Sequence, residues 1–121
     1  MSLVGVDIER ISRIKKVIQK TPGFVTKVFT LLEQDYCKSH SRPEQHYTSR
    51  VCAKEALCKA LGVPVAWRDV EVKNEDSGQP VIHVHGGAAK VLDGRIIRLS
   101  LSHAGDYAIA TVLVEDKLTR E

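Results

Sequence analysis

Aromatic residues are scarce in this sequence, and long apolar runs are missing. Phe, Trp and Tyr make up 5% of the 121 residues, and no aromatic pair falls on a segment with a strand pattern, so a platform for stacking nucleic-acid bases is lacking. No apolar stretch approaches the roughly 20 residues that a membrane-spanning helix needs. The formal net charge of +3 suits an anionic ligand or an acidic partner but is too mild to indicate nucleic acid. We therefore expect neither a nucleic-acid partner nor a membrane.

Cysteines are also few, and the sequence holds no CxxC pair. Cys37, Cys52 and Cys58 are odd in number, which argues against a disulfide or zinc framework and favours free thiols in a reducing cytoplasm. The first residues, MSLVGVDIERISRI, turn charged early and lack the apolar core of a secretory signal. Glycine-rich dinucleotide and Walker motifs are absent. We expect a cytoplasmic protein whose residues 1–121 form one domain with a sizeable core.

The order of apolar and polar residues predicts helices in the first half of the chain and strands in the second. After a first strand over residues 3–8, we expect helices over 9–20, 24–29, 31–40 and 44–61. Strands over 68–73 and 79–86, a short helix over 87–93 and a hairpin of 96–103 and 107–114 follow. Because residues 107–114 are apolar on both faces, that strand should be central. The pattern predicts an α+β fold, in which an N-terminal strand and helices precede a small antiparallel sheet.

The segment RVCAKEALCKALG, residues 50–62, is apolar on almost every side yet carries Glu55 and Lys59. At 3.6 residues per turn these two charges project together, one turn apart, while we expect Arg50 and Lys54 to form a narrow polar edge. One interpretation is an ordinary surface pair that contributes about 0.2–0.5 kcal/mol. The other is a buried helix whose charges bind a metal or a charged ligand.

Asp7 and Glu33 are acidic residues close to the expected starts of helices. Asp7 has two interpretations: the N-cap of the first helix, or a Mg²⁺ ligand that Glu55 would complete, with Lys59 contacting substrate phosphates. Glu33 follows Thr30 by three residues, a spacing that predicts a capping box. The residue pattern alone leaves open whether Asp7, Glu55 and Lys59 meet.

Three histidines lie on predicted strands. His103 ends a strand, where it is either a satisfied residue at the edge of the core or part of a binding site formed by loops. His83 and His85 share one strand face, as metal ligands can, but without a third ligand in view a solvated face is favoured.

The first helix carries a row of basic residues opposite its apolar side, namely Arg13, Lys16 and Lys20. Such a row is either a solvated face or a surface that attracts an acidic helix of a partner protein. A non-catalytic module that binds an acidic protein through this face is therefore one possible function.

Five motifs occur in an order and spacing that resemble those of one enzyme family. Over nearly its whole length the chain is similar to the holo-acyl-carrier-protein synthases, the short class of 4′-phosphopantetheinyl transferases. The combination of G-V-D with K-E-A-x-x-K is the specific part. In chain order the motifs are GVDIERISRI from residue 5, FTLLE at 29–33, RVCAKEALCKALG at 50–62, SGQP at 77–80 and LSLSH at 99–103.

The resemblance implies transfer of the 4′-phosphopantetheine arm of coenzyme A to a serine of an apo-acyl carrier protein, with adenosine 3′,5′-bisphosphate as the other product. It also implies the fold of that family and a homotrimer with its sites between protomers. The serine proton would pass to Glu55 through a water, or to a metal-bound hydroxide.

The resemblance further assigns roles by matching motifs. Asp7 and Glu55 would bind Mg²⁺ and would act in catalysis together with Lys59, which would contact the coenzyme A phosphates. The coenzyme A site would also include His103, Arg50, Gly78 and Pro80. Arg13 would touch the acidic carrier protein, so the basic face that it shares with Lys16 and Lys20 is the expected partner-binding surface.

Overall fold

The computed structural model describes residues 1–117. The first half of the chain is a strand followed by helices, and the second half is mainly strands. In chain order the elements are β1 (Ser2–Arg10), α1 (Ile11–Lys20), α2 (Phe24–Val28), α3 (Leu31–Lys38), α4 (Pro43–Leu61), the 3₁₀ turn η1 (Trp67–Asp69), β2 (Val70–Asn74), β3 (Pro80–Val84), α5 (Gly86–Leu92), β4 (Ile96–Ala104) and β5 (Tyr107–Glu115). The predicted α+β class and the predicted order of elements are confirmed.

The strands form two separate antiparallel sheets. The larger has the order β1-β5-β4, so the strand predicted to be central lies in the middle. Its register pairs Ser2 with Glu115 and Arg10 with Tyr107. The smaller sheet contains only β2 and β3, with Asn74 opposite Pro80 at the turn. The sequence pattern did not reveal this division, because alternation identifies strands but not their partners.

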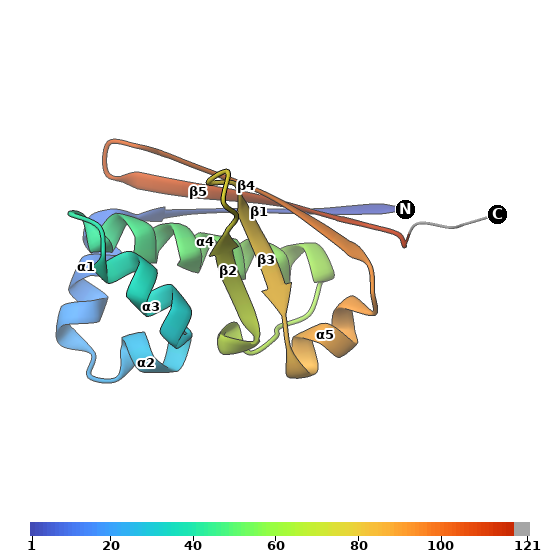
Figure 1. The fold of residues 1–121 in the computed structure, drawn as a ribbon, viewed down its shortest axis with the longest axis horizontal. Coiled ribbons are helices and arrows are strands. Elements are labelled where there is room, and N and C mark those ends of the chain that lie inside the picture. The colour runs from blue at the N-terminus through green and yellow to red at the C-terminus, as the bar shows by residue number, and fades with distance from the viewer. Residues whose placement is uncertain (118–121) are drawn as a thin grey trace.

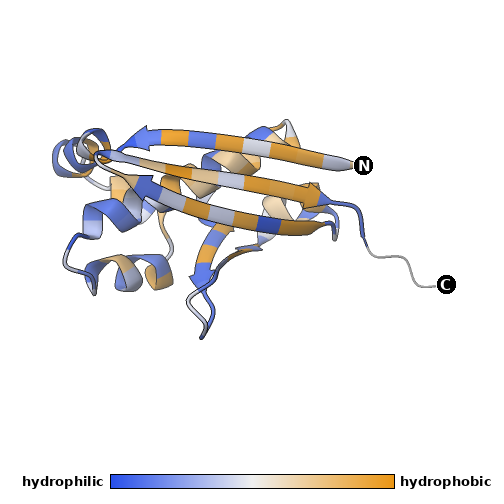
Figure 2. Cartoon of the chain, turned by 90° about the horizontal axis from the view of Figure 1, so that it is seen from above, coloured by the Kyte–Doolittle hydropathy of each residue, from blue (hydrophilic) through white to orange (hydrophobic). Residues whose placement is uncertain are grey.

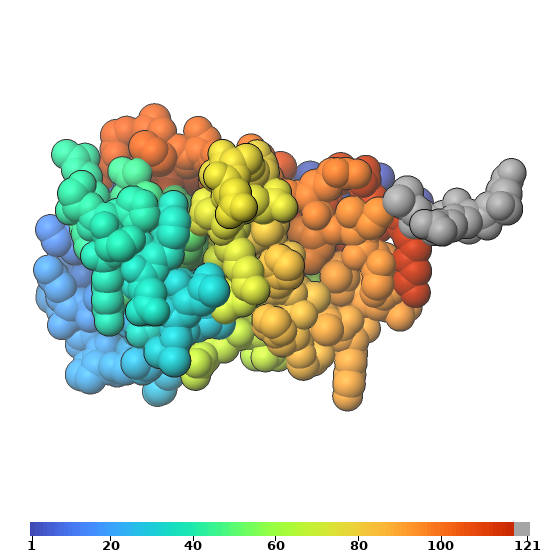
Figure 3. Space-filling view, viewed as in Figure 1, coloured from blue at the N-terminus to red at the C-terminus, as the bar shows by residue number. Residues whose placement is uncertain are grey.

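Helix α4 runs between two hydrophobic cores, which explains why it is apolar nearly all round (Figure 1). One side packs against the larger sheet and the β2–β3 pair through Ala53, Ala56 and Leu57, all fully buried. The opposite side packs Tyr47 and Val51 against α1, α2 and α3. In the space-filling view the N-terminal helices gather at one end and α5 lies toward the other, while the β4–β5 hairpin runs along the top and reaches the end with the helices (Figure 3). The interpretation as a buried helix is confirmed. Within residues 1–117 no helix has the length and apolarity to span a membrane.

Gly5 allows β1 to lie directly against α4. A Cβ atom at this position would come within 1.9 Å of the backbone oxygen of Ala56 and 2.7 Å of the nitrogen of Ala60. Only glycine permits such an approach of two backbones. Because side chains alternate along a strand, Asp7, two residues later, also faces α4.

The junction of β1 and α1 differs from the prediction. Pairing with β5 keeps residues 9 and 10 in the strand, so the helix begins at Ile11 and Asp7 lies within β1 rather than at its end. Asp106, from the β4–β5 turn, caps the helix by accepting from the backbone N–H of Ser12 at 2.9 Å and from the Ser12 hydroxyl. The N-cap interpretation of Asp7 is therefore wrong, because the cap comes from the far end of the chain.

The face of the larger sheet that points away from α4 carries exposed apolar side chains. We call Val4, Val6 and Ile8 of β1 the outer face; their side chains are 67%, 50% and 57% exposed. Figure 2 looks onto this sheet, and apolar segments recur along its strands. An apolar face of this kind on an antiparallel sheet indicates a contact surface.

Candidate functional site

Asp7 and Lys59 meet where β1 crosses α4. The Lys59 ammonium lies 3.2 Å from Oδ1 of Asp7 and also donates to the backbone oxygen of Val6 at 3.1 Å. Asp7 is only 7% exposed, and its Oδ2 is buried without a hydrogen-bond partner. A buried carboxylate oxygen of this kind is costly unless a ligand completes it.

Glu55 shares the helix face that meets Asp7. The Asp7 carboxyl is close enough to Cys52 to influence its thiol, and it contacts Lys59. Glu55 follows Cys52 by three residues and precedes Lys59 by four, so it lies between them on that face. An open cleft of about 350 Å³ begins here, lined by Glu55, Cys58, Lys59, Gly62, Val63 and Pro64. Asp7, Glu55 and Lys59 therefore share one face of the β1–α4 crossing.

The environment of Asp7 disfavours its charged form. Burial, and after it the neighbouring Glu9 carboxyl, raise the pKa of Asp7 from 3.8 to about 6, against the opposing effect of Lys59. Glu9 is itself paired with Arg13. Our sequence reasoning did not single out Glu9, although its place two residues after Asp7 on the same strand face was a usable signal.

The donor set fits a hard divalent cation. Asp7 offers an orphaned carboxylate oxygen, and Glu55, which lines the cleft, offers a second carboxylate on the helix face that meets Asp7. Within residues 1–117, no three His, Cys, Asp or Glu side chains gather closely enough to hold a metal by themselves. A cation here would take its remaining ligands from water and from substrate phosphates, as Mg²⁺ commonly does.

The predicted polar edge of α4 does not exist, because Lys54 and Arg50 are 0% and 2% exposed. The Lys54 ammonium lies 2.8 Å from Oε1 of Glu33 and also donates to the backbone oxygens of Trp67 and Val70. Burial lowers the pKa of Lys54, and the Glu33 carboxylate opposes that shift. The period of the helix suggested an edge, but the partners that permit burial come from other elements.

Glu33 confirms one prediction and exceeds it. The capping box with Thr30 is present: the Glu33 backbone N–H donates to the Thr30 hydroxyl, and the Thr30 N–H donates to Oε1 of Glu33 at 3.0 Å. The same carboxylate accepts from Lys54 and, through Oε2, from the backbone N–H of Val72 at 2.9 Å. Glu33 therefore joins α3, α4 and β2.

Arg50 is held between an aromatic ring and an amide. Its guanidinium carbon lies 4.1 Å from the centroid of Tyr36, and one terminal nitrogen donates to Oδ1 of Asn74 at 2.9 Å. The Nε atom is buried without a partner. Asn74 is the last residue of β2, and its side chain donates to the backbone oxygen of Gly78 in the turn that follows, so Arg50 is connected to that turn.

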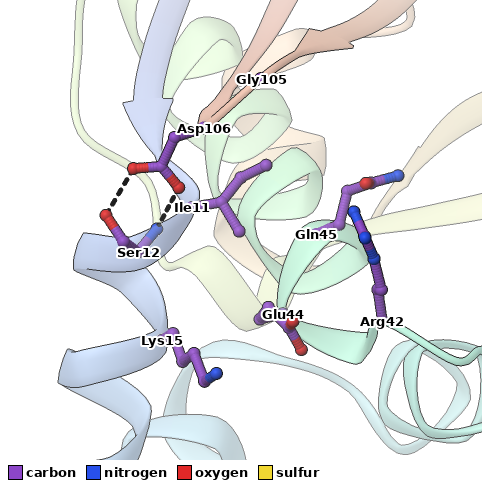
Figure 4. A pocket seen from close by; sticks show the side chains of 8 residues that line it. All are labelled: Ile11, Ser12, Lys15, Arg42, Glu44, Gln45, Gly105 and Asp106. Carbon is purple, nitrogen blue, oxygen red and sulfur yellow. Dashed lines mark hydrogen bonds between the residues drawn. The ribbon is translucent and has the colours of Figure 1, made fainter.

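His103 is exposed at the end of β4, so its interpretation as a core-edge residue is wrong. Its Nε2 lies 3.2 Å from the side-chain nitrogen of Gln45. Gln45 also lines a cavity of about 240 Å³ between α1, the start of α4 and the β4–β5 turn (Figure 4). This cavity contains two basic side chains, Lys15 and Arg42.

The remaining predicted residues lie at the surface. The side chains of Arg13, Lys16 and Lys20 are exposed along α1. His83 and His85 are exposed on β3 and just after it, and His85 is 3.6 Å from a carboxylate oxygen of Glu71. The favoured interpretation of a solvated strand face is thus confirmed for these two histidines.

The arrangement of Asp7, Glu55 and Lys59 coincides with a match to a known family. The family model described as the 4′-phosphopantetheinyl transferase superfamily matches residues 3–112. The chain belongs to this superfamily. The resemblance that the five motifs carried is therefore confirmed.

Curated relatives are similar from end to end. The holo-[acyl-carrier-protein] synthase of Moorella thermoacetica is 38% identical, with 97% of this chain and 96% of the relative covered. That of Koribacter versatilis is 39% identical, with 93% and 96% covered. Nearly the whole length of this chain is therefore matched by nearly the whole length of these two relatives.

Solved structures have the same fold. A holo-(acyl-carrier-protein) synthase of Bacillus anthracis, in complex with coenzyme A (3′,5′-ADP), matches with a TM-score of 0.81 and 31% identity over 95% of this chain and 96% of that one. The ACPS–coenzyme A complex of Chronobacterium ammoniagenes matches with a TM-score of 0.86 and 28% identity over 98% and 99%. The predicted fold of the transferase family is confirmed.

Proposed function

We propose that this protein is a holo-[acyl-carrier-protein] synthase. It transfers the 4′-phosphopantetheine group from coenzyme A to a serine hydroxyl of an apo-acyl carrier protein and releases adenosine 3′,5′-bisphosphate. The observation that carries the proposal is the set of Asp7, Glu55 and Lys59 at one crossing of β1 and α4, beside an open cleft, in a chain that matches such synthases along its length.

The coenzyme A site extends from this cleft. Lys59, half-exposed at the rim, contacts the phosphates as a point charge. By motif, His103 and Arg50 belong to the same site, and Gly78 and Pro80 lie near the adenosine end. The positive φ of Gly78, 91°, supports a turn whose backbone can approach a ligand closely.

Asp7 and Glu55 hold Mg²⁺ in this proposal. The orphaned Oδ2 of Asp7 supports it, because a cation would complete that oxygen and reverse the unfavourable burial of the carboxylate. When bound, Mg²⁺ neutralises charge that builds on the leaving phosphate.

The side chains position the substrate and balance its charge. Lys59 stabilises the negative charge of the transferring phosphate. Glu55 accepts the proton of the attacking serine hydroxyl through a water molecule. A weak base suffices, because positioning and charge neutralisation contribute most to transfers of this type.

The carrier protein binds along α1. Arg13, Lys16 and Lys20 form an exposed basic face there, which favours an acidic partner through electrostatic steering.

The outer face of β1 supports a homotrimer with sites between protomers, because three exposed apolar side chains would be covered by a neighbouring protomer. All three cysteines are free thiols, which supports a cytoplasmic location. The proposed carrier-protein substrate implies a role in fatty acid biosynthesis.

The proposal is tested by measuring release of adenosine 3′,5′-bisphosphate by chromatography. We expect release from coenzyme A only when apo-carrier protein and Mg²⁺ are present. A carrier protein whose acceptor serine is replaced by alanine is the control and should give no release. Release that does not depend on the carrier protein, or none with several carrier proteins, would contradict the proposal.

A further inference from the structure

Arg50 does not lie in the open cleft but inside the protein. It is 2% exposed, with its guanidinium against the Tyr36 ring at 4.1 Å. A buried guanidinium requires partners, and the side-chain partner that it has is Oδ1 of Asn74, at 2.9 Å. Arg50 therefore lacks the exposure that a direct contact with a bound nucleotide would need.

Asn74 in turn bonds to the β2–β3 turn and so connects Arg50 to it. Its side-chain nitrogen donates to the backbone oxygen of Gly78 at 3.1 Å. The other hydrogen bonds of the turn stay within it: Glu75 N–H donates to Gln79 oxygen at 2.9 Å, Gly78 N–H to Glu75 oxygen at 2.7 Å, and Gln79 N–H to the Ser77 hydroxyl at 3.3 Å. Among the hydrogen bonds within residues 1–117, the one from Arg50 ties this exposed turn to α4.

The residues packed around Arg50 also connect to His103. His46, one helical turn before Arg50, is packed against the rings of Tyr36 and His40 at 5.5 and 4.2 Å between centroids. The next residue back, Gln45, contacts His103. Contacts through Arg50 and the neighbouring rings thus link His103 to the turn with Gly78. These are two parts of the chain that our proposed function places in the coenzyme A site.

We propose that Arg50 is a positioning residue that acts through Asn74 to hold the β2–β3 turn in place for the adenosine end of coenzyme A. This inference rests on the proposed function. In this inference Asn74 holds the turn by its hydrogen bond to Gly78. Arg50 fixes Asn74 in place and does not itself contact coenzyme A.

The test compares coenzyme A binding, by titration calorimetry, with the steady-state constants of Asn74→Ala, Arg50→Ala and the double variant. Asn74→Ala should raise the Kd and the KM for coenzyme A about fivefold, the size expected for loss of one ordinary hydrogen bond. The kcat and the KM for carrier protein should stay within about twofold. Glu75→Ala, in the same exposed turn, is the matched control and should bind as the unaltered protein does.

Two further comparisons separate positioning from direct contact. If Arg50 acts through Asn74, the double variant should bind coenzyme A no more weakly than Arg50→Ala, because both changes break one pathway. Arg50→Lys keeps the charge but loses the planar fork and the ring contact, so it should bind as weakly as Arg50→Ala.

Additive losses in the double variant, full binding in Arg50→Lys, or unchanged binding in Asn74→Ala would each overturn the inference. Asn74→Ala alone decides it if the Arg50 variants do not fold, since Asn74 is exposed. Failure of the unaltered protein to bind coenzyme A is a different result, which would refute the proposed function itself.

Discussion

Asp7 has two features that are unfavourable for a carboxylate in a folded protein. It is nearly buried with one oxygen unpartnered, and its pKa is raised to about 6 by burial and by the neighbouring Glu9 carboxyl. Perturbed acids of this kind cluster at functional sites. At the scale of single residues, Asp7 is therefore expected to matter for activity at some cost to the stability of the metal-free protein.

Replacing Asp7 or Glu55 by alanine should abolish turnover while the protein stays folded. Each change removes a proposed metal ligand, and the cleft side of α4 loses no packing that the two cores depend on. Turnover measured by adenosine 3′,5′-bisphosphate release, with circular dichroism to check the fold, tests this. Asp35→Ala, at an exposed position on α3, is the control and should remain active. Unaltered activity in either variant would exclude the assigned role.

Asp7→Asn should stabilise the metal-free protein above pH 6. Because folding raises the pKa of Asp7 from 3.8 to about 6, the folded state binds the proton more tightly, and this contribution to stability is lost as pH rises from about 4 to 6. Asparagine is uncharged throughout, so the variant should gain up to about 3 kcal/mol at pH 7, less where solvent screens the carboxylate, and nothing below pH 4. The pKa of about 6 already includes the opposing effect of the half-exposed Lys59 ammonium, so that pair makes no separate contribution to the difference.

Urea unfolding of both proteins across pH 3.5–8 measures the difference. Adding Mg²⁺ should raise the stability of the unaltered protein at pH 7 more than that of the variant, since a ligand stabilises the state that binds it. A difference that stays constant with pH would mean that Asp7 is not the titrating group.

At the scale of elements, the buried pair of Lys54 and Glu33 links α3, α4 and β2. Lys54→Met should destabilise the protein by about 3–5 kcal/mol, because it leaves the Glu33 carboxylate buried without its cation. Adding Glu33→Gln should recover part of this loss, since the uncharged amide costs less to bury. Lys38→Met, exposed in the last turn of α3, should change the unfolding free energy by less than about 0.5 kcal/mol.

The free energies of unfolding in urea decide between these outcomes. A loss below about 1 kcal/mol in Lys54→Met would show that the pair contributes little net stability, as some buried ion pairs do. A double variant with a lower free energy of unfolding than Lys54→Met would mean that Glu33 acts mainly through its capping box.

Local patterns predicted what depends on neighbouring residues. The capping box of Thr30 and Glu33 and the end of α4 at Gly62, with φ of 74°, follow from short spacings and backbone chemistry. The central place of β5 follows from its two apolar faces. The contact of Asp7 with Lys59 spans 52 positions. The residue types made a shared site one interpretation and the family resemblance favoured it, but no local spacing could bring the two side chains together.

Tertiary contacts account for the predictions that were wrong. Lys54 looked like an edge residue because its partner Glu33 is 21 positions away. Asp7 looked like an N-cap because the real cap, Asp106, is 94 positions from Ser12. Neither spacing carries a local signal, so periodicity assigned each residue the role that its neighbours suggested.

At the scale of the whole molecule, the outer face of Val4, Val6 and Ile8 is the feature that the single chain does not explain. If it forms the contact between protomers, Val6→Glu should place an unpaired charge in that contact and dissociate the trimer. Sedimentation equilibrium should then give the mass of a monomer, with turnover lost because the sites lie between protomers.

The matched control is Val91→Glu, an exposed valine on α5 away from the outer face. It should remain trimeric and active. A Val6→Glu protein that is still trimeric would place the contact elsewhere, and a monomeric unaltered protein with full activity would refute sites shared between protomers.

The most direct test of the central claim is the intact mass of an apo-acyl carrier protein after incubation with this protein, coenzyme A and Mg²⁺. The account predicts a gain of one phosphopantetheine unit, lost when EDTA is added and absent with the Glu55→Ala variant. No gain across several carrier proteins would contradict the account and leave a module that binds acidic proteins through Arg13, Lys16 and Lys20 as the better description.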